Sequence, residues 1–137
     1  MTYFKDCTPY SYGVADQPRM LSVGWLDKRY PFPKGEIDPA LIEKLRRLVA
    51  KSTWITRGLH ICEFCEIPAA LAEVHQQGRT GDPAYWEWLK PRSSNGEIRV
   101  SLHSVTYAAP FLVPHYIEVH KYLPPQPFLV AVEQAPE

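Results

Sequence analysis

Residues 56–65 read TRGLHICEFC, and this stretch holds two of the chain's three cysteines, with a histidine two positions before the first of them. Apolar residues alternate with His60 and Cys62, which predicts a strand over residues 54–62. Side chains two apart on a strand point to the same side, so His60 and Cys62 should face the same region of the fold. Cys65 follows after two more residues. The segment of the chain that packs against this strand and turn therefore decides how the chain folds.

Two cysteines separated by two residues can reach one metal ion from a single tight turn. Structural zinc sites take four sulfur or nitrogen ligands in a tetrahedron. Cys62 and Cys65 have the required spacing, and His60 can join them from the strand. The sequence thus predicts a Zn²⁺ site with three local ligands, and the fourth ligand has to come from a distant part of the chain.

Four other histidines are present, and His115 is the preferred fourth ligand. It lies in the first turns of a predicted helix, on the apolar stripe that should face inward. His103, His120, Cys7 and a water molecule remain open as the fourth ligand in its place. His115 and His120 are five residues apart, about 140° around a helix, so we expect only one of them to reach the ion unless the helix bends.

The cysteine pair has two further interpretations. The two thiols could be inert and buried, since free cysteine is among the most buried residue types. They could also form a redox pair, which needs its first cysteine at a helix N-terminus, where the thiol pKa is lowered. The helix signal here begins only at Pro68, beyond both cysteines. For His60 or His115 alone, a buried ring with one hydrogen bond would be the simpler interpretation, and the neighbouring cysteines are what favour metal binding.

The rest of the chain predicts a single α+β domain over residues 1–137. Asp38 is a suitable N-cap, Pro39 suits the first helical position, and leucines repeat on one face of the helix that follows. The expected architecture is a small, mainly antiparallel sheet packed by two or three helices. Strands are expected at 21–26, 54–62, 97–102 and 104–108, a turn at 93–96, helices at 38–52, 111–123 and about 128–132, and a helical surface insertion at 67–94.

Composition limits the function classes. Fifteen basic and fifteen acidic residues balance, so no long-range field would attract nucleic acid or an anionic membrane. The N-terminus lacks the apolar core of a signal peptide, and no segment reaches the roughly 20 apolar residues of a membrane span. An odd number of cysteines fits a reducing compartment. We therefore expect a cytoplasmic protein.

No sequence motif points to an enzyme. The His-Glu-x-x-His motif, the zinc-deaminase pattern and the glycine-rich nucleotide loops are all missing. The favoured function is a zinc-binding domain with a structural ion that acts through protein binding, in an unspecified oligomeric state. A second possibility is a hydrolase in which water takes the fourth zinc position and Glu63 or Glu66 acts as base. A third is an immunity or regulatory partner protein that presents Trp86 and Trp88.

Several segments together resemble an uncharacterised bacterial domain-of-unknown-function family. They are TYFKDCTPYSYG at 2–13, TRGLHICEFC at 56–65 and VTYAAPFLVPHYIEVHKYLPP at 105–125. The features in common are an N-terminal Thr-Pro-Tyr-Ser-Tyr, a His-x-Cys-x-x-Cys segment and a C-terminal His-Tyr helix. The resemblance covers nearly the whole chain apart from about residues 67–94. It implies no activity, and it implies that the characteristic polar positions are His60, Cys62, Cys65 and His115.

Overall fold

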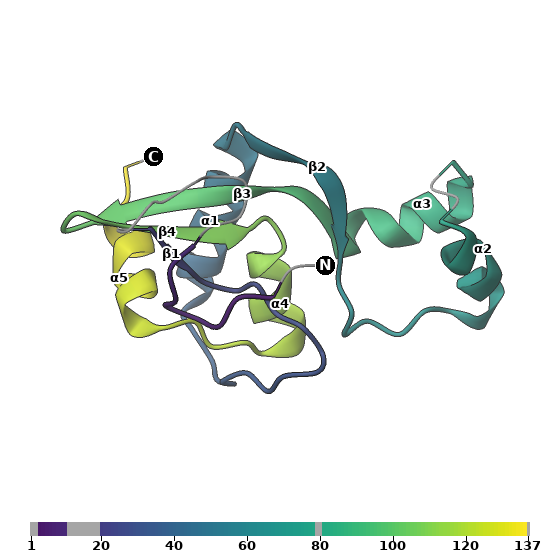
Figure 1. Cartoon of the computed structure of the whole chain (residues 1–137), viewed down its shortest axis with the longest axis horizontal. Helices are drawn as coiled ribbons and strands as arrows, with labels where there is room; N and C mark the ends of the chain where they lie inside the picture. Colours follow the sequence, from purple (N-terminus) through teal and green to yellow (C-terminus); the bar gives the residue numbers. More distant parts are fainter. Residues whose placement is uncertain (1–2, 11–19, 79–80, 137) are drawn as a thin grey trace.

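The computed structural model describes residues 3–10, 20–78 and 81–136, and it has an α+β fold, as predicted (Figure 1). Four strands form one sheet in the order β1-β4-β3-β2. β1 runs parallel to β4, and the other neighbours are antiparallel. The strands are β1 Met20–Ser22, β2 Trp54–Ile61, β3 Ser93–Leu102 and β4 Val105–Pro110. The predicted mainly antiparallel sheet is confirmed.

Side chains of the central β3–β4 hairpin alternate between the two faces of the sheet. Ile98 pairs with Ala109 and Val100 with Tyr107, and all four side chains join the main core. The intervening residues point the other way, as alternation on a strand requires. The hairpin was predicted, but the turn expected at 93–96 is wrong, because these residues are the first part of β3.

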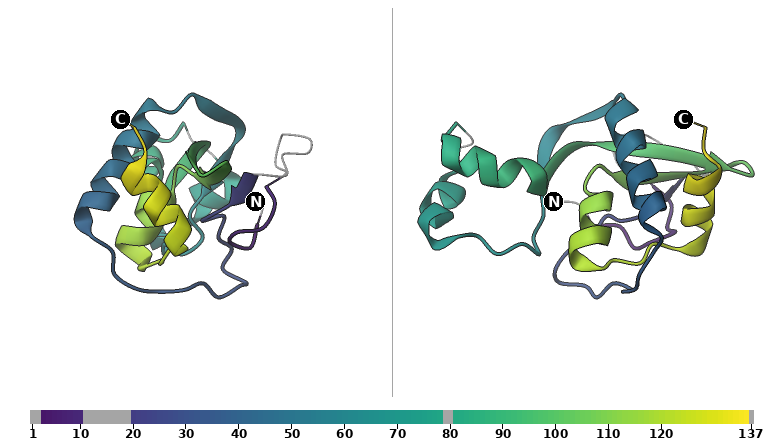
Figure 2. Two further views of the ribbon diagram at one scale, coloured as in Figure 1. Left: turned by 90° about the vertical axis from the view of Figure 1, so that its left-hand side faces the viewer. Right: turned by 180° about the vertical axis from the view of Figure 1, so that it is seen from behind.

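Three helices cover the main-core face (Figure 2). They are α1 Pro39–Lys51, α4 Val113–His120 and α5 Gln126–Gln134. α1 begins as the sequence predicts, with the Asp38 carboxylate accepting a hydrogen bond from the Ala40 amide at 2.9 Å. α4 ends earlier than expected, because Lys121 takes a left-handed conformation with φ 60°. Among the described residues, no helix is long and apolar enough to cross a membrane.

The opposite face of the sheet carries a smaller core built by the N-terminal segment. Tyr10, Met20 and Trp25 pack around Ala108 of β4. The Trp25 indole donates a hydrogen bond to the Ala108 carbonyl at 3.0 Å. β1 is shorter than the expected strand at 21–26, since the chain turns at Gly24 with φ 78°. Residues 11–13, the second half of the Thr-Pro-Tyr-Ser-Tyr segment and its following glycine, lie outside the described residues.

Residues 68–78 and 81–92 form a projecting helical arm between β2 and β3 (Figures 1 and 2). Asp82 caps its longest helix by accepting a hydrogen bond from the Tyr85 amide at 3.1 Å. His75 Nδ1 lies 2.7 Å from the Tyr85 hydroxyl, which joins the two helices of the arm. The arm contains the 3₁₀ turns Ala69–Leu71 and Lys90–Arg92 and the helices α2 Ala72–Gln77 and α3 Pro83–Leu89. Both ends of the arm lie next to the cysteine pair, because the Cys62 amide donates to the Arg92 carbonyl at 2.8 Å.

Candidate metal centre

Two cysteines and two histidines converge where the end of β2 meets α4. One ligand atom from each of Cys62, Cys65, His115 and His120 lies within 4.8 Å of the other three. Cys65 Sγ is 3.3 Å from His115 Nε2 and 3.5 Å from His120 Nε2, and Cys62 Sγ is 3.4 Å from His120 Nε2. The four donor atoms are close enough together to hold one metal ion.

Local structure explains the position of the two sulfurs. β2 ends at Ile61, and the following bend carries Cys62 and Cys65 to one side. Phe64, between them, packs edge-on against Tyr116 at 5.9 Å between ring centroids. This contact fixes the cysteine turn against α4, the helix that supplies both histidines.

Both α4 histidines reach the cluster, and the expectation that only one of them could do so is wrong. The 140° separation describes where side chains leave the helix, whereas an imidazole nitrogen lies several ångströms further out. His120 is the last residue of α4, so no following helical turn constrains its ring. The His115 and His120 ring centroids are 5.1 Å apart. Their Nε2 atoms therefore both reach the cysteine sulfurs.

His60 is not brought to this cluster. Its Nε2 lies 3.0 Å from the Tyr116 hydroxyl, and its ring packs edge-on against Trp25. The strand ends at Ile61, so the two-residue alternation that placed His60 beside Cys62 stops one residue too early. The structure thus unites three of the four side chains predicted from the sequence, and His120 takes the place given to His60.

His103 and Cys7, which the sequence left open as the fourth ligand, lie away from the cluster. His103 is exposed in the turn between β3 and β4, with φ 52°. Cys7 is an exposed free thiol, and its amide donates to the Ser22 carbonyl on the N-terminal side of the sheet. Among His103, Cys7 and His120, only His120 completes the cluster. α4 ends at His120 because Lys121 takes a left-handed conformation, and no signal in the sequence marks this end.

Cys62 is buried in the cluster, and Cys65, His115 and His120 are half-buried. Burial raises the pKa of the Cys62 thiol to about 12, and this side chain is 3% exposed. Burial also lowers the pKa of His115 to about 4, with smaller effects from the charges of His120 and Arg92. Neutral imidazoles keep a lone pair free for a cation. The raised thiol pKa argues against the redox interpretation, which needs a thiolate-favouring site.

Burial of His60 should make the domain sensitive to acid. Burial lowers its pKa from 6.5 to about 4, so the unfolded chain binds a proton that the folded chain excludes. The stabilisation is complete above pH 6.5 and is lost as the pH falls toward 4. Between pH 7 and pH 5 the wild type should lose about 2 kcal/mol of unfolding free energy through this group.

The measurement is urea unfolding of metal-saturated protein at both pH values. His60→Gln keeps a hydrogen-bonding group for Tyr116 and removes the titration, so it should lose about 2 kcal/mol less than the wild type over this interval. Equal losses in the two proteins would assign the acid sensitivity to other groups.

Comparison with curated proteins and with solved structures gives no match. The family comparison gives one, which extends over residues 2–133. The matched range contains the four residues of the cluster and the whole arm. It also agrees with the resemblance noted from the sequence segments, which pointed to a family without an assigned activity. The chain belongs to the domain-of-unknown-function family DUF7919.

Proposed function

We propose that this domain binds one Zn²⁺ ion through Cys62, Cys65, His115 and His120. The convergence of these four donor atoms is the observation that carries the proposal. Ligands about 2.0 to 2.3 Å from a tetrahedral zinc lie about 3.3 to 3.8 Å from one another. The sulfur–nitrogen distances of 3.3 to 3.5 Å fall in this range. Two thiolates and two imidazoles are also a donor set that zinc prefers over harder cations.

The ion has a structural role in this proposal. Four side chains fill a tetrahedron, whereas a zinc hydrolase keeps one position open for water. Glu63, one candidate base of a hydrolase, lies close to the loop at Lys28, with 3.4 Å between its carboxylate oxygen and the Lys28 amide nitrogen. The zinc would fasten the end of β2 and the base of the arm to α4. Thiolate ligands persist in a reducing compartment, which supports a cytoplasmic location.

Protein binding is the proposed biological role, with the arm and the adjacent edge strand as the contact surface. Trp86 and Ile67 are each 37% exposed, and Leu59 on β2 is 42% exposed. Aromatic side chains such as that of Trp86 are enriched in protein interfaces. Trp88 does not contribute in the same way, because it stacks on Tyr85 with 6.2 Å between ring centroids.

Metal analysis of ligand variants tests the proposed centre. The wild type should contain one zinc per chain, and Cys62→Ser, His115→Ala and His120→Ala should each lose most of it, because three ligands bind zinc far more weakly than four. His60→Gln and Cys7→Ser are matched controls that should keep the full content. Zinc loss in His60→Gln together with retention in His120→Ala would contradict the ligand assignment, and full content in every variant would contradict the site.

A further inference from the structure

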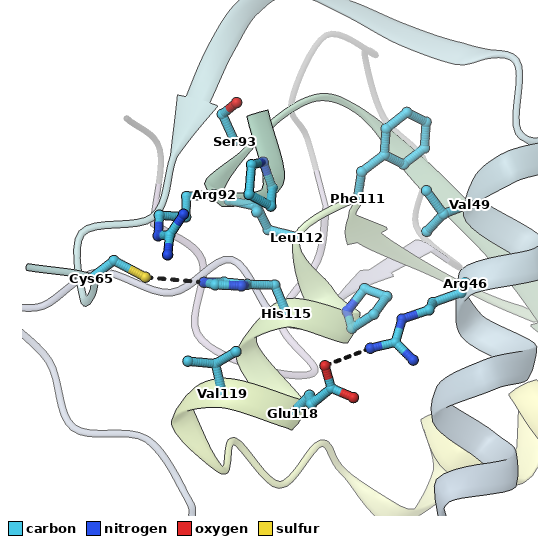
Figure 3. Close-up of a pocket in the computed structure, with 12 residues that line it drawn as sticks. Arg46, Val49, Cys65, Arg92, Ser93, Phe111, Leu112, His115, Glu118 and Val119 are labelled. Atoms are coloured by element: carbon cyan, nitrogen blue, oxygen red, sulfur yellow. Dashed lines mark hydrogen bonds and ion pairs between the residues drawn. The ribbon is translucent and has the colours of Figure 1, made fainter. Parts of the chain in front are cut away.

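A cavity of about 440 Å³ opens beside the metal centre (Figure 3). Cys65 and His115 form part of its wall, and Val49, Phe111 and Leu112 supply apolar surface. Small-molecule sites in proteins have volumes of roughly 300–1,000 Å³ and combine apolar walls with a few fixed polar groups. The cavity is therefore large enough for a small organic molecule.

One of the two arginines in the cavity wall is already neutralised. Arg46 on α1 forms an ion pair with Glu118 on α4 at 2.6 Å (Figure 3). It also contacts Glu43. Both carboxylates are within reach of the same guanidinium. Arg46 therefore has little free charge to offer a ligand.

Arg92, on the other side of the cavity, has no carboxylate paired with it among the described residues. Its Nη1 donates a hydrogen bond to the Trp88 carbonyl at 2.8 Å, and its guanidinium lies 5.1 Å from the Trp88 ring centroid. In the part of the chain that the structure describes, Arg92 forms no ion pair, and its hydrogen bonds use only Nη1. Nε and Nη2 remain as donors. The side chain is half-buried beside Cys65 and His115 (Figure 3).

The metal centre does not supply the missing negative charge. Two thiolates balance the two positive charges of a zinc ion, and the imidazoles are neutral, so the filled centre has no net charge. A half-buried guanidinium with free donors next to an apolar cavity is suited to a carboxylate, which it can bind through two parallel hydrogen bonds.

We propose that this cavity binds a compact apolar group that carries a carboxylate, with the carboxylate on Arg92 and the apolar part against Val49, Phe111 and Leu112. A free organic acid and the C-terminus of a peptide both have this chemistry. The proposal goes beyond the zinc site, and it depends on the cavity and on Arg92 rather than on the identity of the metal.

The test is a titration of metal-loaded protein with 3-phenylpropionate, followed by methyl NMR and calorimetry. Binding should shift the methyl signals of Val49 and Leu112 and leave those of Leu129, which lies on α5 and does not line the cavity, unchanged. The neutral analogue 3-phenylpropionamide should bind about tenfold more weakly, because it cannot form the charged pair with Arg92. An acetylated tetrapeptide ending in leucine, as acid and as amide, tests the peptide source in the same way.

Arg92→Gln removes the charge and should weaken binding of either acid by about tenfold. Lys90→Gln removes an equal charge two residues away, on an exposed side chain outside the cavity, and should leave the affinity unchanged. Zinc content measured on the same samples separates damage to the metal centre from loss of ligand binding. Equal affinity for acid and amide in the wild type, or no methyl shifts at Val49 and Leu112 with either acid, would overturn the proposal.

Discussion

Stripping the proposed zinc ion from the folded protein should lower its melting temperature by about 20 °C or more. A structural zinc contributes on the order of 10 kcal/mol to folding, because the unfolded chain has no assembled site. For a domain of this length, each kcal/mol is equivalent to roughly 2–4 °C. The proposed ion joins Cys65 to His115, which are 50 residues apart in the chain. Its loss would release the turn after β2 from α4, and thermal unfolding with and without a strong chelator measures the effect.

Readdition of zinc separates metal loss from other effects of the chelator. Zinc should restore the melting temperature, and magnesium should not, because its preferred ligands are oxygen atoms. His120→Ala protein should melt at the lower temperature already and should respond little to the chelator. A wild-type melting temperature that stays unchanged after the metal has been removed would contradict a structural role for the ion.

The elements predicted correctly are those with strong local signals. Asp38 and Pro39 mark the start of α1, and the leucines behind them fix its buried face, with Leu45 fully enclosed. The β3–β4 hairpin follows from alternating apolar residues. Such signals depend on neighbours in sequence, so they can be found without knowing what the element packs against.

The turn predicted at 93–96 failed because tertiary packing overrides local preference. Ser, Asn and Gly favour turns when considered alone. In the structure, Gly96 lies under the ring of Phe111, and a Cβ at this position would be 2.3 Å from that ring. The glycine is thus a point of close approach within a strand, which the sequence could not distinguish from a turn.

The candidate site was predictable only where its signal is local in the sequence. Cys62 and Cys65 are a local pattern with a known ligand spacing. The choice between His60 and His120 depends on where β2 and α4 end. β2 ends one residue before its predicted end, and α4 ends three residues before its predicted end. Ends of elements are the least predictable feature of a sequence.

Gly24→Ala should destabilise the domain by about 3 kcal/mol or more. Gly24 has φ 78°, a conformation that costs a residue with a side chain about 1–2 kcal/mol. An added Cβ would also lie 2.4 Å from Val113 Cγ2, inside the buried core. Overpacking of a core adds about 1–3 kcal/mol. Val113 is the first residue of α4, so the shift needed to relieve this clash would move His115 relative to the cysteines. Urea unfolding measures the stability, and zinc competition measures the affinity.

Gly78→Ala is the matched control for the backbone term. Gly78 has a similar φ of 65°, but it lies at the end of α2 in the arm, and a Cβ there would have nothing within 4 Å. This variant should lose only about 1 kcal/mol and keep the full zinc affinity. The difference in unfolding free energy between the two variants is then the cost of the steric clash between residue 24 and Val113 of α4. If both variants lost the same stability, the contact between Gly24 and Val113 would not be a constraint on the fold. If Gly24→Ala lost stability without losing zinc affinity, α4 would hold its place through its other contacts.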